Sequence, residues 1–179
     1  MPLALALAYM LRLRGVEVTS ITLDLATDKG IRTDRRKGSN DNFVPWTPRM
    51  RQIWDLALDV RRKSLGSRPE AIRKEDRYLF LNETGSPLVK STFDSAWQRL
   101  ITNAIGKGII DERDRFSPHD LKRKGGTEAK GNRGDRQDAL GLSDAMMAVY
   151  DLSVPTVDTT EAAFEDESFT EYFTEMQKK

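Results

Sequence analysis

Apolar residues recur at helical spacing in three long stretches of the chain. Residues 3–18 are apolar over most of their length and predict one buried opening helix. A second helix should begin at Thr47-Pro48, because a capping residue followed by a proline is a common helix start. A third should have Ser91 or Thr92 as its cap. The apolar positions of these last two helices are Met50, Ile53, Trp54, Ala57 and Val60, and then Phe93, Ala96, Trp97, Leu100, Ile101, Ala104 and Ile105.

The last third of the chain carries further helix signals. Ser117-Pro118, like Thr47-Pro48, is a capping residue followed by proline and predicts the start of a helix. Gly125-Gly126 should end or bend that helix. Residues 133–150 predict two short helices broken around Gly141. The tail, residues 156–179, has capping-box spacing and a narrow apolar stripe, which favour a helix there as well.

Short β-strand signals lie between these helices. Residues 30–36, a polar turn and residues 42–46 predict an antiparallel hairpin, with Pro45 near the end of its second strand. A further short strand is expected over residues 77–81. The chain should therefore have an α+β fold that is mainly helical and contains a small antiparallel β-sheet.

Charge is distributed unevenly along the 179 residues. Residues 1–150 hold 27 lysines and arginines against 20 aspartates and glutamates, a net charge of +7, whereas residues 151–179 have a net charge of −6. A basic body with an acidic tail suits a polyanionic partner such as double-stranded DNA. A charge of +7 is also ordinary for a soluble domain of this size, so charge alone leaves both interpretations open.

Composition argues against several classes of protein. With no cysteine and one histidine, the chain lacks the residues for a disulfide framework or a zinc site, and we expect no metal and no small-molecule cofactor. The absence of cysteine is compatible with a cytoplasmic location. The apolar start resembles a signal peptide, but it has no basic leading region, and Arg12 and Arg14 interrupt it before a membrane-spanning length. We therefore expect no association with a membrane.

The only histidine lies in a chemically suggestive setting. His119 is surrounded by cations just inside a predicted helix start, and Tyr150 follows 31 positions later. This set suits attack on a phosphodiester, with a phenol as nucleophile, an imidazole for its proton and cations for the non-bridging oxygens. Two further basic elements, at Arg14 and Lys37, lie upstream. Each residue also has an ordinary interpretation, as a tyrosine at a helix end, a histidine bonded to backbone, or a solvated or locally paired cation.

In their order and spacing these elements resemble the catalytic domain of the tyrosine recombinases, the phage integrase family. The match covers about residues 3–155. Arg14 lies in the family's Arg-x-x-Glu pattern, and Lys37 lies in its hairpin. The segment His119–Lys122 resembles the family's His-x-x-Arg box, and Tyr150 matches its nucleophile.

The resemblance implies the DNA breaking-rejoining fold and a reaction that cuts and rejoins duplex DNA through a phosphotyrosyl intermediate on Tyr150. In this chemistry Arg14 and Lys122 would hold the non-bridging oxygens as charge builds at phosphorus. Lys37 would protonate the departing 5′-oxygen, and His119 would accept or relay the tyrosine proton. Phage integration or excision is the expected context.

Two positions depart from the family pattern. Lys122 stands where the box usually ends in arginine, and lysine offers a point charge instead of a planar two-pronged contact. Leu142 lies in the neighbourhood where the family usually carries histidine or tryptophan. These departures leave an alternative open, a catalytically impaired DNA-binding remnant of a phage integrase. A helical interaction domain that does not bind DNA is a third hypothesis.

The resemblance also divides the chain into a catalytic domain, residues 1–155, and an acidic tail, residues 156–179. The tail could dock in trans on a neighbouring subunit, as C-terminal helices do in the family, so we expect self-association on DNA. Packing in cis and disorder are equally open for so acidic a segment. The family's separate N-terminal DNA-binding domain is not in this sequence, which is either a fragment or a protein that has lost that domain.

Overall fold

The apolar opening segment forms two helices, α1 (Pro2–Met10) and α2 (Gly15–Thr19), so the prediction of one helix over residues 3–18 is wrong. Leu11 and Leu13 are both buried. Two positions apart on a continuous helix, they would point in different directions. Between them Arg12 has φ of 54°, and the Leu13 N–H donates to the Ala8 carbonyl at 2.9 Å. The chain therefore turns here, which directs both leucines into the core.

The predicted hairpin is present. In the computed structural model, which describes residues 1–35, 39–143 and 145–147, β1 (Gly30–Arg32) pairs with β2 (Phe43–Pro45) in antiparallel register. Each strand is shorter than predicted, and Pro45 ends the second strand as expected from its missing N–H. A Cβ on Gly30 would lie 2.3 Å from the Val44 carbonyl oxygen on the partner strand, so only glycine fits at that position of the pair.

Helix α3 (Pro48–Leu65) starts as predicted, because the Thr47 hydroxyl accepts a hydrogen bond from the Met50 N–H at 3.2 Å. The predicted inward position Val60 is instead half exposed, at 50%. Its neighbour Arg61 is buried, and its Nε donates to the Tyr78 carbonyl at 2.8 Å. The apolar pattern was therefore right for the first turns of this helix and wrong for the last.

Residues 77–81 do not form the expected strand. Thr22, just before the short 3-10 turn η1 (Leu23–Leu25), forms an isolated bridge with Tyr78, which follows a second 3-10 turn, η2 (Lys74–Asp76). Leu81 forms another isolated bridge, so this extended segment never gains a continuous ladder. A run of apolar residues is sufficient to bury a segment, but a strand also needs a partner edge of matching length.

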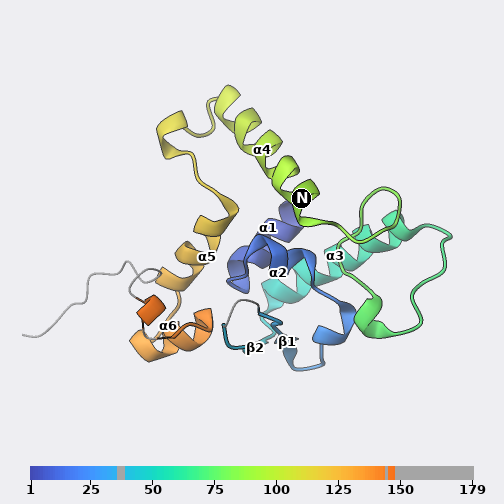
Figure 1. The fold of residues 1–179 in the computed structure, drawn as a ribbon, viewed down its shortest axis with the longest axis horizontal. Coiled ribbons are helices and arrows are strands. Elements are labelled where there is room, and N and C mark those ends of the chain that lie inside the picture. Colours follow the sequence, from blue (N-terminus) through green and yellow to red (C-terminus); the bar gives the residue numbers. More distant parts are fainter. Residues whose placement is uncertain (36–38, 144, 148–179) are drawn as a thin grey trace, which may run out of the picture.

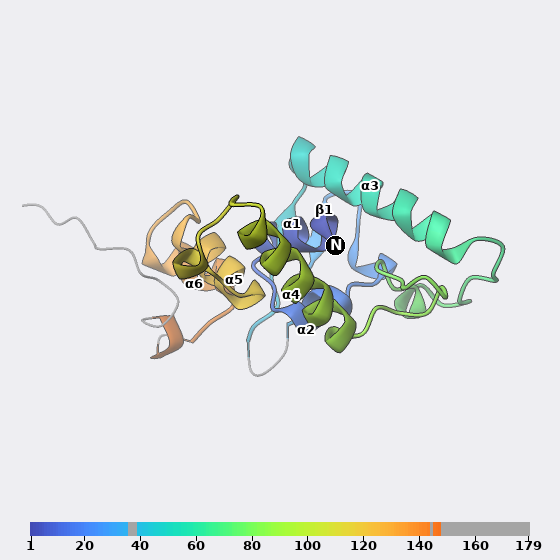
Figure 2. The same ribbon diagram turned by 90° about the horizontal axis from the view of Figure 1, so that it is seen from above.

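Helix α4 (Lys90–Gly106) packs on α2 and rises above it in Figure 1, and Figure 2 shows the two helices side by side. Its N-cap is Val89, so the predicted Ser91 or Thr92 cap is wrong. Phe93, Trp97 and Ile101 form its buried face, as the spacing predicted, whereas Leu100, which was predicted among the same apolar positions, is exposed. A short 3-10 turn, η3 (Glu112–Asp114), follows in the connecting loop.

Helices α5 (Pro118–Thr127) and α6 (Arg133–Leu140) complete the described fold. Gly125 and Gly126 lie inside α5 and do not end it. A Cβ on Gly125 would lie 2.6 Å from the Tyr9 carbonyl oxygen, and one on Gly126 would lie 2.6 Å from a Leu140 methyl group. The paired glycines therefore let α1 and α6 approach α5 closely. The predicted break after α6 is confirmed at Gly141, which is left-handed with φ of 63°.

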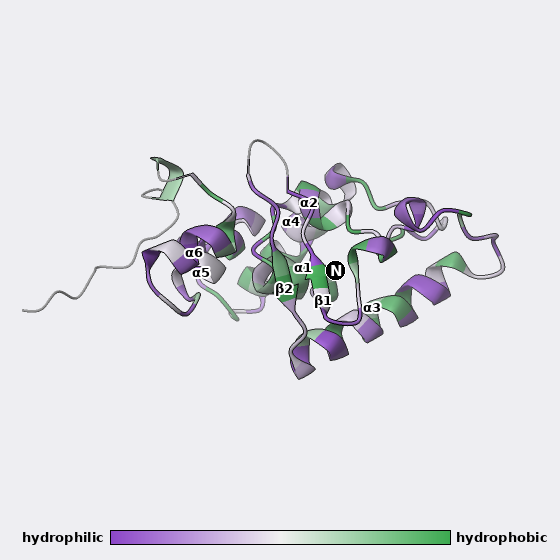
Figure 3. Ribbon diagram, turned by 90° about the horizontal axis from the view of Figure 1, so that it is seen from below, coloured by the Kyte–Doolittle hydropathy of each residue, from purple (hydrophilic) through white to green (hydrophobic). Residues whose placement is uncertain are grey.

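The main core lies between α1, α2, α3 and α4, and Ile31 of β1 packs into it. Figure 3 shows hydrophobic colour gathered at α1 and β1, whereas α3 alternates between polar and apolar turns. A separate small cluster contains Leu140, Leu142 and Met147. The predicted class, α+β and mainly helical with a small antiparallel sheet, is confirmed. None of the helices in the described ranges is long and apolar enough to cross a bilayer.

Candidate functional site

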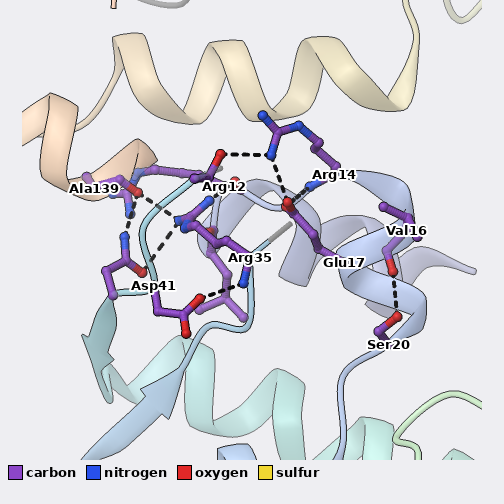
Figure 4. Close-up of polar contacts among 11 residues, drawn as sticks. Arg12, Arg14, Val16, Glu17, Ser20, Arg35, Asp41 and Ala139 are labelled. Carbon is purple, nitrogen blue, oxygen red and sulfur yellow. Dashed lines mark hydrogen bonds and ion pairs between the residues drawn. The ribbon is translucent and has the colours of Figure 1, made fainter. Parts of the chain in front are cut away.

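Arg14 is fixed by the glutamate three positions later. Its Nη1 donates to the Glu17 carboxylate at 2.8 Å, and its backbone N–H donates to the other carboxylate oxygen at 2.7 Å (Figure 4). The Glu17 side chain is fully buried, whereas that of Arg14 is 16% exposed. Nη1 also donates to the Ser39 hydroxyl in the hairpin at 3.1 Å. A buried carboxylate thus orients a guanidinium whose edge stays accessible.

His119 and Lys122 lie three positions apart on α5 and therefore on one face of it. The start of this helix is well defined, because the Ser117 N–H and hydroxyl both donate to the Asp120 carboxylate at 2.8 Å. His119 is exposed. Lys122 is fully buried, at 0% exposure, which sequence reasoning did not anticipate for a phosphate-binding cation.

Electrostatic coupling places these residues in one neighbourhood. Burial, opposed by Glu17 and reinforced by the positive charges of Arg35 and Arg14, lowers the pKa of Lys122 to about 7. Burial also lowers the pKa of His119, followed by the positive charge of Arg14. At neutral pH the imidazole is therefore mainly neutral and able to accept a proton.

Arg35 is a buried member of this neighbourhood that the sequence analysis missed. Its side chain is directed into the protein, and the residue is 7% exposed. Its Nη1 donates to the Arg12 carbonyl at 2.9 Å, and its Nη2 donates to the carbonyls of Leu11 and Ala139 at 3.1 and 2.9 Å. No local spacing marks it, because Arg35 is one of several basic residues at the hairpin tip. Only the tertiary fold shows that it is buried.

The hairpin also contacts the segment that leads toward Tyr150. The Asn42 side chain donates to the carbonyls of Asp138 and Ala139 at 2.9 Å, and the Asn40 N–H donates to the Gly141 carbonyl at 2.9 Å. Leu142, which departs from the expected pattern, packs with Leu140 and Met147. An apolar side chain in this cluster has no group that could bond to a phosphate.

The described residues therefore bring together three of the five predicted site residues, Arg14, His119 and Lys122. Lys37 and Tyr150 lie outside the described residues, as does the tail, so their roles stay predictions. In the described part of the chain, no group of three histidine, aspartate or glutamate side chains could hold a metal ion. An oriented arginine, a neutral imidazole and a buried lysine can together stabilise negative charge and accept a proton.

Comparison with known proteins adds a finding at the level of the fold. No protein-family model matches the chain, and no curated protein matches its sequence. Solved structures do match. The Tn1549 transposon integrase in complex with a circular intermediate DNA superposes with a TM-score of 0.71 at 18% identity, over 91% of this chain and 57% of the integrase chain. The chain has the tyrosine-recombinase catalytic fold.

Two more structures with the tyrosine-recombinase fold agree. XerA recombinase matches with a TM-score of 0.60 at 19% identity, over 93% of this chain and 55% of its own. A lambda integrase dimer bound to a core site matches with a TM-score of 0.61 at 17% identity, over 88% of this chain and 45% of the integrase chain. This chain therefore spans about half the length of these recombinases. The fold that the sequence resemblance predicted is confirmed.

Proposed function

We propose that this chain is the catalytic domain of a tyrosine-type site-specific recombinase that cuts and rejoins duplex DNA, as in integration or excision. The observation that carries the proposal is the convergence of Arg14, His119 and Lys122 within a chain of this fold. These residues come from segments about a hundred positions apart, and they supply the charge and the proton acceptor that phosphoryl transfer needs.

The proposed reaction is a transesterification, in which one phosphoester bond forms as another breaks, so their number is conserved. The Tyr150 hydroxyl oxygen attacks phosphorus, its proton passes to His119, and the bond to the 5′-oxygen breaks. Lys37 gives a proton to that departing oxygen. Arg14 balances the charge on the non-bridging oxygens, and Lys122 adds positive potential from beneath. Attack by the free 5′-hydroxyl on the phosphotyrosine reverses the steps and rejoins the strand.

Trapping the covalent intermediate tests this proposal. The protein is incubated with a pool of nicked duplexes of randomised sequence, from which the short strand diffuses away after cleavage. We expect a protein–DNA adduct that survives denaturation and disappears in Tyr150→Phe. Persistence of the adduct in Tyr150→Phe, or a complete lack of adduct with the unsubstituted chain, would contradict the enzyme proposal.

A second candidate is a DNA-binding remnant that no longer cleaves. Two observations favour it: Lys122, which stands where the family usually has arginine, is buried, and Leu142 lies in an apolar cluster. Binding to duplex DNA that weakens steeply from low to moderate salt, with no adduct on any substrate, would identify the remnant. Salt-independent binding, or none, would leave the third hypothesis, a helical interaction domain.

Assembly and location extend the proposal. The lambda integrase structures are a dimer on a core site and a tetramer on a Holliday junction, so we propose that this chain also self-associates on duplex DNA in the cytoplasm. Within the proposed division into a catalytic domain of residues 1–155 and a tail of residues 156–179, the tail would dock on a neighbouring subunit. An unchanged mass of the DNA complex after deletion of residues 158–179 would contradict that docking.

A further inference from the structure

The turn that leads to Arg14 is under backbone strain. Among the described residues, Arg12 is the only one other than glycine with a positive φ, at 54°. For a residue with a Cβ this conformation costs about 1 kcal/mol or more, so it persists only where neighbouring groups hold it. Two positions later Arg14 is the N-cap of α2, so the turn sets the place at which the chain enters this helix.

Two arginine side chains hold the turn from opposite sides. The Arg12 Nε donates to the Gly125 carbonyl of α5 at 3.1 Å. From the hairpin, Arg35 donates to both carbonyls of the turn, those of Leu11 and Arg12, and to the Ala139 carbonyl near the end of α6 (Figure 4). One guanidinium therefore connects the hairpin with the C-terminal ends of two helices.

The chemistry of these contacts suits arginine. Carbonyls at helix C-terminal ends lack partners within the helix and carry partial negative charge. A planar guanidinium offers donors that diverge toward separate acceptors, whereas lysine offers donors from a single nitrogen. Burial lowers the pKa of Arg35 to about 10, so the side chain remains charged at neutral pH. Its guanidinium donates to neutral oxygens, those of three backbone carbonyls and the Asn42 amide.

We infer that Arg35 is a positioning residue for Arg14. By holding the carbonyls of Leu11 and Arg12, it fixes the strained turn from which Arg14 reaches the scissile phosphate, and it ties that turn to the end of α6. The reaction it serves is the one proposed above, and the inference rests on that proposed function.

The first test does not depend on activity. Arg35→Lys keeps the positive charge but removes the planar guanidinium with its diverging donors. Its matched control is Arg61→Lys. Arg61 is an equally buried arginine that bonds a carbonyl, that of Tyr78, on α3. Loss of one or two hydrogen bonds should accelerate amide exchange in residues 11–17 about tenfold relative to α3. Arg61→Lys should leave residues 11–17 unchanged. Equal exchange in Arg35→Lys and the unsubstituted chain would overturn the inference.

The second test separates positioning from a general loss of structure. Adduct formation is timed on nicked duplexes with either a normal scissile phosphate or a methylphosphonate, which lacks the charge that Arg14 balances. Arg35→Lys should react about tenfold more slowly on the phosphate, with unchanged duplex affinity, and close to normally on the methylphosphonate. Equal slowing on both linkages, or none, would overturn the inference.

Failure of the two proposals can be told apart. If the unsubstituted chain forms no adduct on either linkage, the proposed function fails, and hydrogen exchange alone decides whether Arg35 holds the turn. If Arg35→Lys lacks a cooperative unfolding transition, Arg35→Gln takes its place, since its shorter amide still donates to carbonyls.

Discussion

Burial of Lys122 should make the stability of this protein depend on pH above neutrality. Its pKa is about 7 in the folded chain and 10.5 for a free lysine. Between these values the unfolded chain binds a proton that the folded chain has released, so the free energy of unfolding rises with pH. Below pH 7 both states are protonated, and the folded state bears the full cost of a buried charge. Glu17, Arg35 and Arg14 are the charged neighbours that set this pKa.

The magnitude follows from the two pKa values. Between pH 7 and pH 9 the contribution of Lys122 should grow by about 2 kcal/mol, within the limit of about 1.4 kcal/mol per pH unit for one proton. Lys122→Met removes this titration and leaves the His119 imidazole and the N-terminal amine in place. Urea unfolding of both proteins at each pH gives the difference between their free energies of unfolding.

The unsubstituted protein should therefore gain stability relative to Lys122→Met as pH rises. Parallel curves for the two proteins between pH 7 and pH 9 would refute the reasoning. The same linkage predicts proton uptake on DNA binding, because a phosphate nearby favours the charged lysine. Calorimetry of duplex binding in buffers of different ionisation enthalpy would measure that uptake, which Lys122→Met should reduce.

Two further predictions concern the scaffold. Gly141→Ala should destabilise the protein by at least about 2 kcal/mol more than Gly108→Ala: both positions have φ near +65°, but only a Cβ on Gly141 would collide with the hairpin backbone. Equal losses in urea unfolding would contradict the close contact between the hairpin and α6. Phe93→Ala should cost about 3–5 kcal/mol, because this ring is fully buried in α4, whereas Leu100→Ala on the exposed side of the same helix should cost far less. A loss below about 1 kcal/mol for Phe93→Ala would show that α4 does not depend on its buried face.

The parts of the fold that the sequence predicted are those that depend on residues close together in the chain, such as helix caps and turns. Thr47 and Ser117, each followed by proline, cap helices where expected. The two predicted hairpin strands, one on each side of the polar turn, pair with each other. The break at Arg12 could not be predicted in this way. Arginine has no preference for a positive φ, and what fixes that conformation is contact with α5 and the hairpin.

Some residues of the candidate site could likewise be found from the sequence, and others only from the fold. Arg14 was found because its partner Glu17 is three positions away, and His119 because it is the only histidine. The burial of Lys122 and the contacts of Arg35 depend on which segments of the folded chain pack against them. Neither residue type nor spacing carries that information, since both residues belong to basic runs that would ordinarily face water.

The bond between Arg35 and the Ala139 carbonyl joins positions 104 apart. During synthesis the hairpin therefore emerges from the ribosome long before the end of α6 exists, and the loop between them must close at an entropic cost. A nascent chain interrupted before α6 would lack this closure. The cluster of Arg14, Arg35, His119 and Lys122 can therefore assemble fully only after α6 has been synthesised.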